Sequence, residues 1–221
     1  MKAARNKAAI RLHDRVNLIA LPVVGVLSVA GLLGYYDQGK VTNMMLSYIV
    51  ADLLWIWLEP GCLPSMPGTI MVHHAVTILL LLFPLRVEGL HHLTCWDTIV
   101  EINTFFLIAR RQLPSCRRLM HWAFWISFFP LRMVLYPYLV VHIYYVLAQL
   151  PWYERFTAVA CQIILCGFNC MMLTASLQRM FSSDRTRAFS MLQGFCTGDL
   201  SFVKDQKKDV YITADTTAKS C

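Results

Sequence analysis

The chain has 221 residues, of which 57% are hydrophobic and 15% are charged, and its mean hydropathy is +0.51. Soluble proteins carry about 25% charged residues, so this composition excludes an ordinary soluble domain and predicts a single all-α polytopic membrane protein. The net charge of +7 does not indicate nucleic-acid binding, because the basic residues gather at the ends of apolar runs, where anionic lipid is the expected partner.

Six apolar stretches predict about six transmembrane helices that enclose a polar cavity: 16–36, 43–58, 69–85, 91–109, 119–149 and 156–178. A spanning helix needs about 20 residues, so the second and third stretches depend on their flanking polar and aromatic residues. The fifth stretch is too long for one simple span and contains Pro130 and Pro137. It forms either one kinked helix or two shorter segments.

The distribution of Lys and Arg residues favours one kinked helix over two segments. With six spans, 16 of the 20 Lys and Arg residues fall on one side of the membrane, and the positive-inside rule then places both termini in the cytosol. A seventh span would move the C-terminal basic group across and remove this bias. The expected organisation is a basic cytosolic segment 1–15, a transmembrane domain 16–180 and a disordered cytosolic tail 181–221.

Several polar residues lie inside the predicted spans, where a charged group costs about 2.5 to 3.5 kcal/mol on insertion scales. Such groups usually face a cavity or a partner, so they are the candidate site residues. In chain order they are Asp52, His73, His74, Thr77, Asp97, Glu101, Arg132 and Asn169. Counting residues along each helix puts them between the middle of the bilayer and its cytosolic half, which predicts one shared cavity.

Helical spacing adds detail to this cavity. Asp97 and Glu101 are four residues apart and share a helix face, and Arg132 lies at a depth where it can pair with Glu101. His73 and His74 point about 100° apart, so one can face the cavity while the other packs between helices or holds a carboxylate. A purely structural role remains open for the Glu101–Arg132 pair, and for Asp52 and Asn169 as hydrogen-bonding groups between helices.

The ordered set of residues resembles the TLC domain over about residues 16–180. The pattern consists of an Asp in the second span, His73-His74-Ala75-Val76-Thr77 opening the third, Glu101 to Leu107 leading into Arg110-Arg111, an Arg in the fifth and an Asn in the sixth. The histidine pair is similar to the HHxxT start of the Lag motif. This family includes ceramide synthases, translocation-associated membrane proteins and small TLC-domain proteins of lipid homeostasis, and the resemblance implies an endoplasmic reticulum protein of the small kind.

Two functions follow from the resemblance. In the first, the protein is a ceramide-synthase-like lipid N-acyltransferase, with His73 or His74 as general base, Glu101 or Asp97 orienting it, and acyl-CoA as co-substrate. In ceramide synthases the Lag motif continues to a second His-Asp pair, whose positions are Leu93 and Thr94 here. This departure favours the second function, in which the protein binds or senses a membrane lipid without turnover.

For the binding function, Asp52, Thr77, Asp97, Arg132 and Asn169 are expected to surround the lipid head group, with Arg132 taking a phosphate or carboxylate. We expect no metal and no resident cofactor. A di-metal hydroxylase would need about eight clustered histidines, and the seven here are scattered. A transporter with an Asp and Glu proton relay is a further alternative, which the lack of an internal repeat disfavours.

Overall fold

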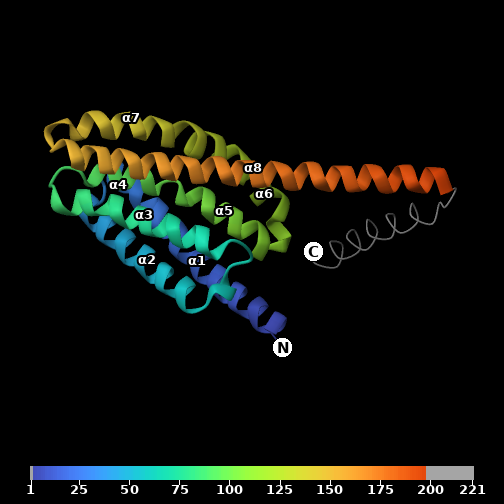
Figure 1. The fold of residues 1–221 in the computed structure, drawn as a ribbon. Helices are drawn as coiled ribbons and strands as arrows, with labels where there is room; N and C mark the ends of the chain where they lie inside the picture. The colour runs from blue at the N-terminus through green and yellow to red at the C-terminus, as the bar shows by residue number, and fades with distance from the viewer. Residues whose placement is uncertain (1, 198–221) are drawn as a thin grey trace. The chain divides into compact units, whose positions relative to one another are not determined.

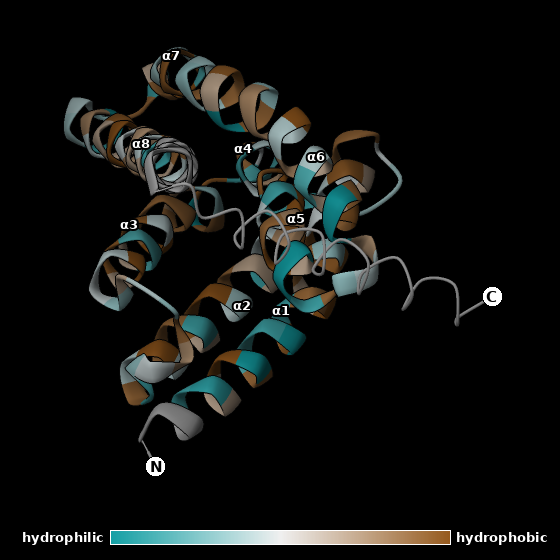
Figure 2. Ribbon diagram, turned by 90° about the vertical axis from the view of Figure 1, so that its right-hand side faces the viewer, coloured by the Kyte–Doolittle hydropathy of each residue, from teal (hydrophilic) through white to brown (hydrophobic). Residues whose placement is uncertain are grey.

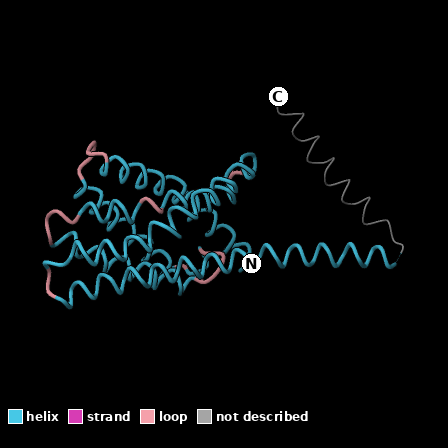
Figure 3. The backbone as a smooth tube through the Cα atoms, turned by 90° about the horizontal axis from the view of Figure 1, so that it is seen from above, coloured by secondary structure: helices cyan, strands magenta, loops and turns pink. Residues whose placement is uncertain are grey.

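The computed structural model describes residues 2–197, with side chains from residue 6 to residue 178. Every regular element in this part of the chain is helical (Figures 1 and 3). Backbone contacts divide the protein into two units, Met1–Cys170 and Met171–Cys221. The first unit holds the helical bundle, and the second holds the continuation of the last helix.

Five helical segments in the described part of the chain are long and apolar enough to cross a bilayer, so the protein is an integral membrane protein. Three of them belong to α1 (Lys2–Leu32), α2 (Gln38–Leu58) and α3 (Pro67–Arg86). The others are the segment Pro114–Gln149 and the part of α8 (Trp152–Thr197) from Trp152 to Gln178. Hydrophobic residues follow these helices in Figure 2, and many large ones face outward.

The predicted fourth span, 91–109, consists of two shorter helices, α4 (His91–Thr98) and α5 (Glu101–Gln112). A turn at Ile99 and Val100 separates them, so neither helix alone is long enough to cross. Acidic Asp97 and Glu101 therefore stand on either side of this break. α1 packs against both helices, and an added Cβ on Gly25 would lie 2.6 Å from Ile102, so the close contact with α5 requires a residue without a side chain.

The long fifth stretch is one continuous helical segment. After the 3-10 turn Pro114–Cys116, α6 (Arg117–Phe128) passes through a π-helical region (Phe129–Leu135) into α7 (Tyr136–Val146), which ends in the 3-10 turn Leu147–Gln149. Pro130 cannot donate a backbone hydrogen bond, and its ring crowds the carbonyl four residues earlier, so the wider π turn accommodates it. A further 3-10 turn, Pro60–Cys62, lies between α2 and α3.

Both predicted domain boundaries fall inside helices. Residues 6–15, expected to be a segment outside the membrane domain, belong to α1, where His13 and Asp14 are buried. The expected tail 181–221 begins within α8, which continues to Thr197. Residues 198–221 lie outside the described residues.

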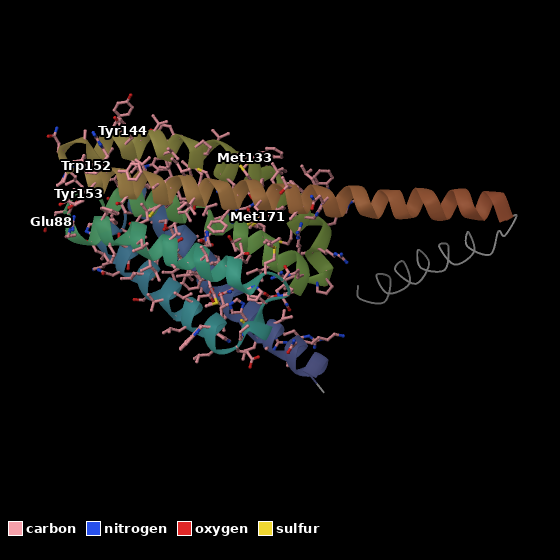
Figure 4. The ribbon with its side chains drawn as sticks, in the orientation of Figure 1. Glu88, Met133, Tyr144, Trp152, Tyr153 and Met171 are labelled. Atoms are coloured by element: carbon pink, nitrogen blue, oxygen red, sulfur yellow. The ribbon has the colours of Figure 1, made fainter. Side chains whose placement is uncertain are left out.

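Exposed aromatic residues gather where α7 meets α8. Tyr144, Trp152 and Tyr153 lie at this end of the bundle together with the exposed carboxylate of Glu88 (Figure 4). The pairing of Arg86 with Glu154 joins α3 to α8 at the same end. Tyr and Trp are enriched at membrane–water interfaces, so this end of the bundle has the chemistry of an interface.

Candidate functional site

A closed cluster of three side chains joins α1, α2 and α3. Asp52 accepts hydrogen bonds from both neighbours, with 2.7 Å from His13 Nε2 to its Oδ1 and 2.7 Å from His74 Nε2 to its Oδ2. All three residues are buried. Because a carboxylate only accepts, each imidazole must present its N–H at Nε2, which sets the orientation of both rings.

Further side chains surround this cluster. Tyr48 donates its hydroxyl to Asn17 Oδ1 at 3.2 Å, and the Asn17 amide nitrogen lies 3.5 Å from His13 Nδ1. The His13 ring also contacts Trp55 edge-on, with 5.3 Å between centroids. Every one of these groups belongs to α1 or α2, so the first helix is fastened to the second by polar contacts inside the apolar bundle.

A second polar network surrounds Arg132 in the π-helical region. Its guanidinium donates to Asn103 Oδ1 at 2.8 Å, to Asn169 Oδ1 at 2.6 Å and to Thr104 Oγ1 at 2.8 Å. Asn103 is itself held by the Phe124 carbonyl and the Ser127 hydroxyl. Glu101 interacts electrostatically with Arg132 and by a hydrogen bond with Thr104, so the buried cation is compensated by a neighbouring carboxylate.

A partly enclosed, narrow cavity lies among α3, α4, α7 and α8, with a volume of about 30 Å³. Its polar lining residues are His73, Thr77, Thr94, Asp97, Thr98 and Glu101. Its apolar lining includes Leu80, Pro84, Leu93, Ile143, Leu147 and Leu165. On α3 the lining runs from His73 to Pro84, about 16 Å at 1.5 Å per residue, and passes from polar to apolar.

Two polar atoms in the cavity lining are buried and lack a hydrogen-bond partner among the described residues. They are His73 Nδ1 and Thr94 Oγ1. Asp97 accepts from Gln162 at 3.0 Å through one oxygen. Buried polar atoms are rarely left unpaired, so the cavity contains the hydrogen-bonding capacity that a polar ligand group or water would use.

The model of the TLC domain family matches residues 33–178, which is well over half of the chain. The chain belongs to the TLC-domain family. No curated protein and no solved structure matches it. The match begins after α1, so the helix that contributes His13 to the closed cluster lies outside the family model.

In this TLC-domain protein the eight predicted site residues lie in three locations. His73, Thr77, Asp97 and Glu101 line the cavity. His74 and Asp52 belong to the closed cluster, and Arg132 and Asn169 belong to the arginine network. The expectation that all of them line one shared cavity is therefore corrected, although Glu101 both lines the cavity and interacts with Arg132.

The adjacent histidines differ in environment, as their 100° separation allows. His74 is fixed by Asp52, whereas His73 faces the cavity and contacts the Phe168 ring edge-on at 5.4 Å. Arg132 is not part of the cavity lining, since its donors are directed to Asn103, Thr104 and Asn169. The predicted contact of Arg132 with a phosphate or carboxylate stays a prediction.

Sequence reasoning missed His13, Asn103 and Gln162. His13 was hidden because it stands in a basic segment before the first apolar run, although its spacing of four residues from Asn17 was a usable signal. Asn103 and Gln162 are uncharged and carry a smaller penalty in hydrocarbon than an ion does. Nothing in their local sequence indicates that each one contacts a charged side chain on another helix.

Proposed function

We propose that this TLC-domain protein binds a membrane lipid with an amine-bearing head group inside the cavity and acts in membrane lipid homeostasis without chemical turnover. The supporting observation is the composition of the cavity, which has two carboxylates and an imidazole at one end and aliphatic side chains at the other. An amphipathic ligand matches the chemistry of both ends, and its entry would require the lining side chains to move apart. Membership of the family points to a lipid-related function but names no lipid.

The charges favour an amine over a phosphate. Asp97 and Glu101 line the cavity, whereas the nearby cation, Arg132, is not among the lining residues and interacts with Glu101 from outside the cavity. An ammonium group placed between the two carboxylates would gain charge-assisted hydrogen bonds. Its hydrocarbon chain would then lie against Leu80, Leu147 and Leu165.

The second candidate function is that of an N-acyltransferase, and His73 is the residue that supports it. Its Nδ1 atom is unpaired among the described residues, and the ring faces the cavity. A general base is normally oriented by a third group. The imidazole that has a carboxylate partner, His74, is engaged in the closed cluster, and this separation of base and orienting group favours binding over catalysis.

Lipid retention tests the proposal. The purified protein is incubated with sphinganine, phosphatidylethanolamine or oleic acid, and bound lipid is measured by mass spectrometry after washing. We expect an amine lipid to be retained, and retention to fall about tenfold in Asp97→Asn and Glu101→Gln, as loss of a charged hydrogen bond predicts. Ala158→Leu, which adds volume at a buried apolar lining position, should weaken retention as well.

The matched control is Glu88→Gln, which removes an exposed carboxylate outside the cavity and should leave retention unchanged. Oleic acid held as well as the amine lipids would contradict the choice of head group. Adding acyl-CoA separates the two candidate functions. An acylated amine that forms with the wild type and disappears in His73→Ala would replace the binding function with the transferase.

The membrane setting is part of the same proposal. We place the protein in the endoplasmic reticulum with both termini in the cytosol, on the basis of the distribution of basic residues and the family resemblance, with α4 and α5 together counted as a sixth crossing. Glycosylation acceptor sites fused to each terminus should remain unmodified in cells. A glycan on either terminus would contradict this topology.

A further inference from the structure

A strongly basic hollow lies at the turn between α5 and α6, outside the cavity and both hydrogen-bonded clusters. It is lined by Arg110, Arg111, Arg117, Arg118 and His121, together with Pro114 and Ser115, and has a volume of about 860 Å³. Among residues 6–178, whose side chains are described, no carboxylate lines it. The 3-10 turn Pro114–Cys116 brings the last residues of α5 and the first residues of α6 to the same hollow.

The arginines of the hollow differ in how they are held. Arg111 donates to Asp14 at 2.8 Å, which compensates one of the four charges. Arg110 lies over the Phe124 ring, 4.6 Å from its centroid, so its orientation is fixed. Arg117 and Arg118 are exposed at the start of α6. The hollow therefore combines positioned guanidinium groups with two that can adapt to a ligand.

Guanidinium groups recognise phosphate through paired parallel hydrogen bonds, which an ammonium cannot reproduce. Four arginines and His121 line the hollow, and the exposed Arg117 and Arg118 offer two guanidinium groups to a ligand. A phosphomonoester carries up to two negative charges and three acceptor oxygens, so it engages two guanidinium groups more fully than a single-charged phosphodiester does.

The position of the hollow indicates a lipid as the source of the phosphate. It lies at the beginning of the candidate span Pro114–Gln149, where head groups meet the bundle. Beyond it, α6 exposes Leu119, Trp122 and Ile126, which are 64%, 57% and 72% exposed. Their spacing puts them along one side of the helix, next to the basic end. A basic hollow followed by an exposed apolar stripe matches the polar head and acyl chains of a phospholipid.

We propose that this hollow binds the phosphomonoester head group of an anionic membrane phospholipid. The Arg117 and Arg118 guanidiniums close on the phosphate oxygens, and the acyl chains lie along α6. The site is separate from the cavity, so it holds a second lipid of opposite head-group charge. Its binding does not depend on the amine-lipid proposal.

The test is titration of the detergent-solubilised full chain with dioctanoyl phosphatidic acid, measured by calorimetry, with dioctanoyl phosphatidylcholine for comparison. We expect phosphatidic acid to bind at least about tenfold more tightly. Arg117→Gln/Arg118→Gln should weaken it about tenfold or more, and Arg117→Lys/Arg118→Lys should restore only part of the affinity, because lysine keeps the charge but loses the paired geometry. Arg111 is left intact because it holds Asp14.

The matched control is Lys7→Gln/Arg11→Gln, which removes the same two charges from exposed positions on α1. The proposed site would be overturned if the control weakened the affinity for phosphatidic acid equally, or if the lysine pair restored that affinity fully. Either result would indicate a general effect of charge. If inorganic phosphate or coenzyme A bound as tightly as phosphatidic acid, the proposal that the phosphate belongs to a lipid would be overturned. Asp97→Asn should leave this affinity unchanged, so failure here and failure of the cavity proposal are distinguishable.

Discussion

The closed cluster His13–Asp52–His74 and the cavity around His73, Asp97 and Glu101 use the same residue types with opposite results. In the cluster, both carboxylate oxygens of Asp52 accept hydrogen bonds from imidazoles of neighbouring helices. In the cavity, His73 and Thr94 each leave a polar atom unpaired among the described residues, and in the cluster His74 leaves its Nδ1 unpaired as well. Two adjacent histidines on α3 thus belong to different environments, and we expect one group to maintain the fold and the other to bind a ligand.

The strongest test of this difference between cluster and cavity is the substitution Asp52→Ala. Two buried imidazoles would lose their acceptor at once, so we expect the free energy of unfolding to fall by about 3 kcal/mol, the usual cost of removing one partner of a buried charged group. Thermal unfolding in detergent, followed by tryptophan fluorescence, measures the change. Glu88→Gln is the control, and a loss no larger than that of the control would contradict the structural role of the cluster.

Paired histidine variants come next in size. His13→Ala removes a buried ring that contacts both Asp52 and Trp55, and we expect a loss of about 2 kcal/mol. His73→Ala removes a ring without a hydrogen bond at its buried Nδ1, and should cost less than about 1 kcal/mol while weakening lipid retention. The same denaturation and retention measurements apply to both. Reversal of the order would mean that the two environments had been assigned the wrong roles.

The thiol of Cys62 reports on the closed cluster without changing it. Cys62 is fully buried, and burial, together with the negative charge of nearby Asp52, raises its pKa to about 11. The thiolate therefore forms only at high pH, and alkylation should be slow at pH 7.5 and accelerate as pH rises towards 11. The exposed Cys116 should react readily, and its separate modification rate, followed by peptide mass spectrometry, is the internal control.

In Asp52→Ala, we expect the alkylation rate of Cys62 at pH 7.5 to rise about tenfold because the loosened cluster opens more often. Cys116 should keep its rate. If Cys62 in the wild type reacted as fast as Cys116, the described burial of this junction would be contradicted.

The smallest expected change in stability belongs to the cavity. Thr94→Val replaces an unpaired buried hydroxyl with a methyl group of similar shape, so the free energy of unfolding should change by no more than about 0.5 kcal/mol or increase slightly. Lipid retention is the informative readout here, and a fall of a few fold is expected if the hydroxyl contacts the ligand. A large loss of stability would indicate that Thr94 is part of the structural core.

Sequence and structure agree most closely where a property depends on composition or on neighbouring residues along one helix. The apolar runs and the clustering of basic residues at their ends determined the class of protein, because apolar runs of this length are typical of membrane-spanning helices. Helical spacing was sufficient to separate His73 from His74 and to place Asp97 and Glu101 together at the cavity. The single helical segment through Pro130 agrees with the preference that the distribution of basic residues indicated.

Contacts between helices were decided by the tertiary structure alone. His13 reaches Asp52 across 39 residues of chain, and Arg132 reaches Asn169 across 37. No periodicity encodes which face of one helix meets another, since crossing angles and rotations depend on packing over the whole bundle. The sequence by itself therefore determined which side chains had to avoid lipid, and only the fold decided which of them satisfy one another and which remain available to a ligand.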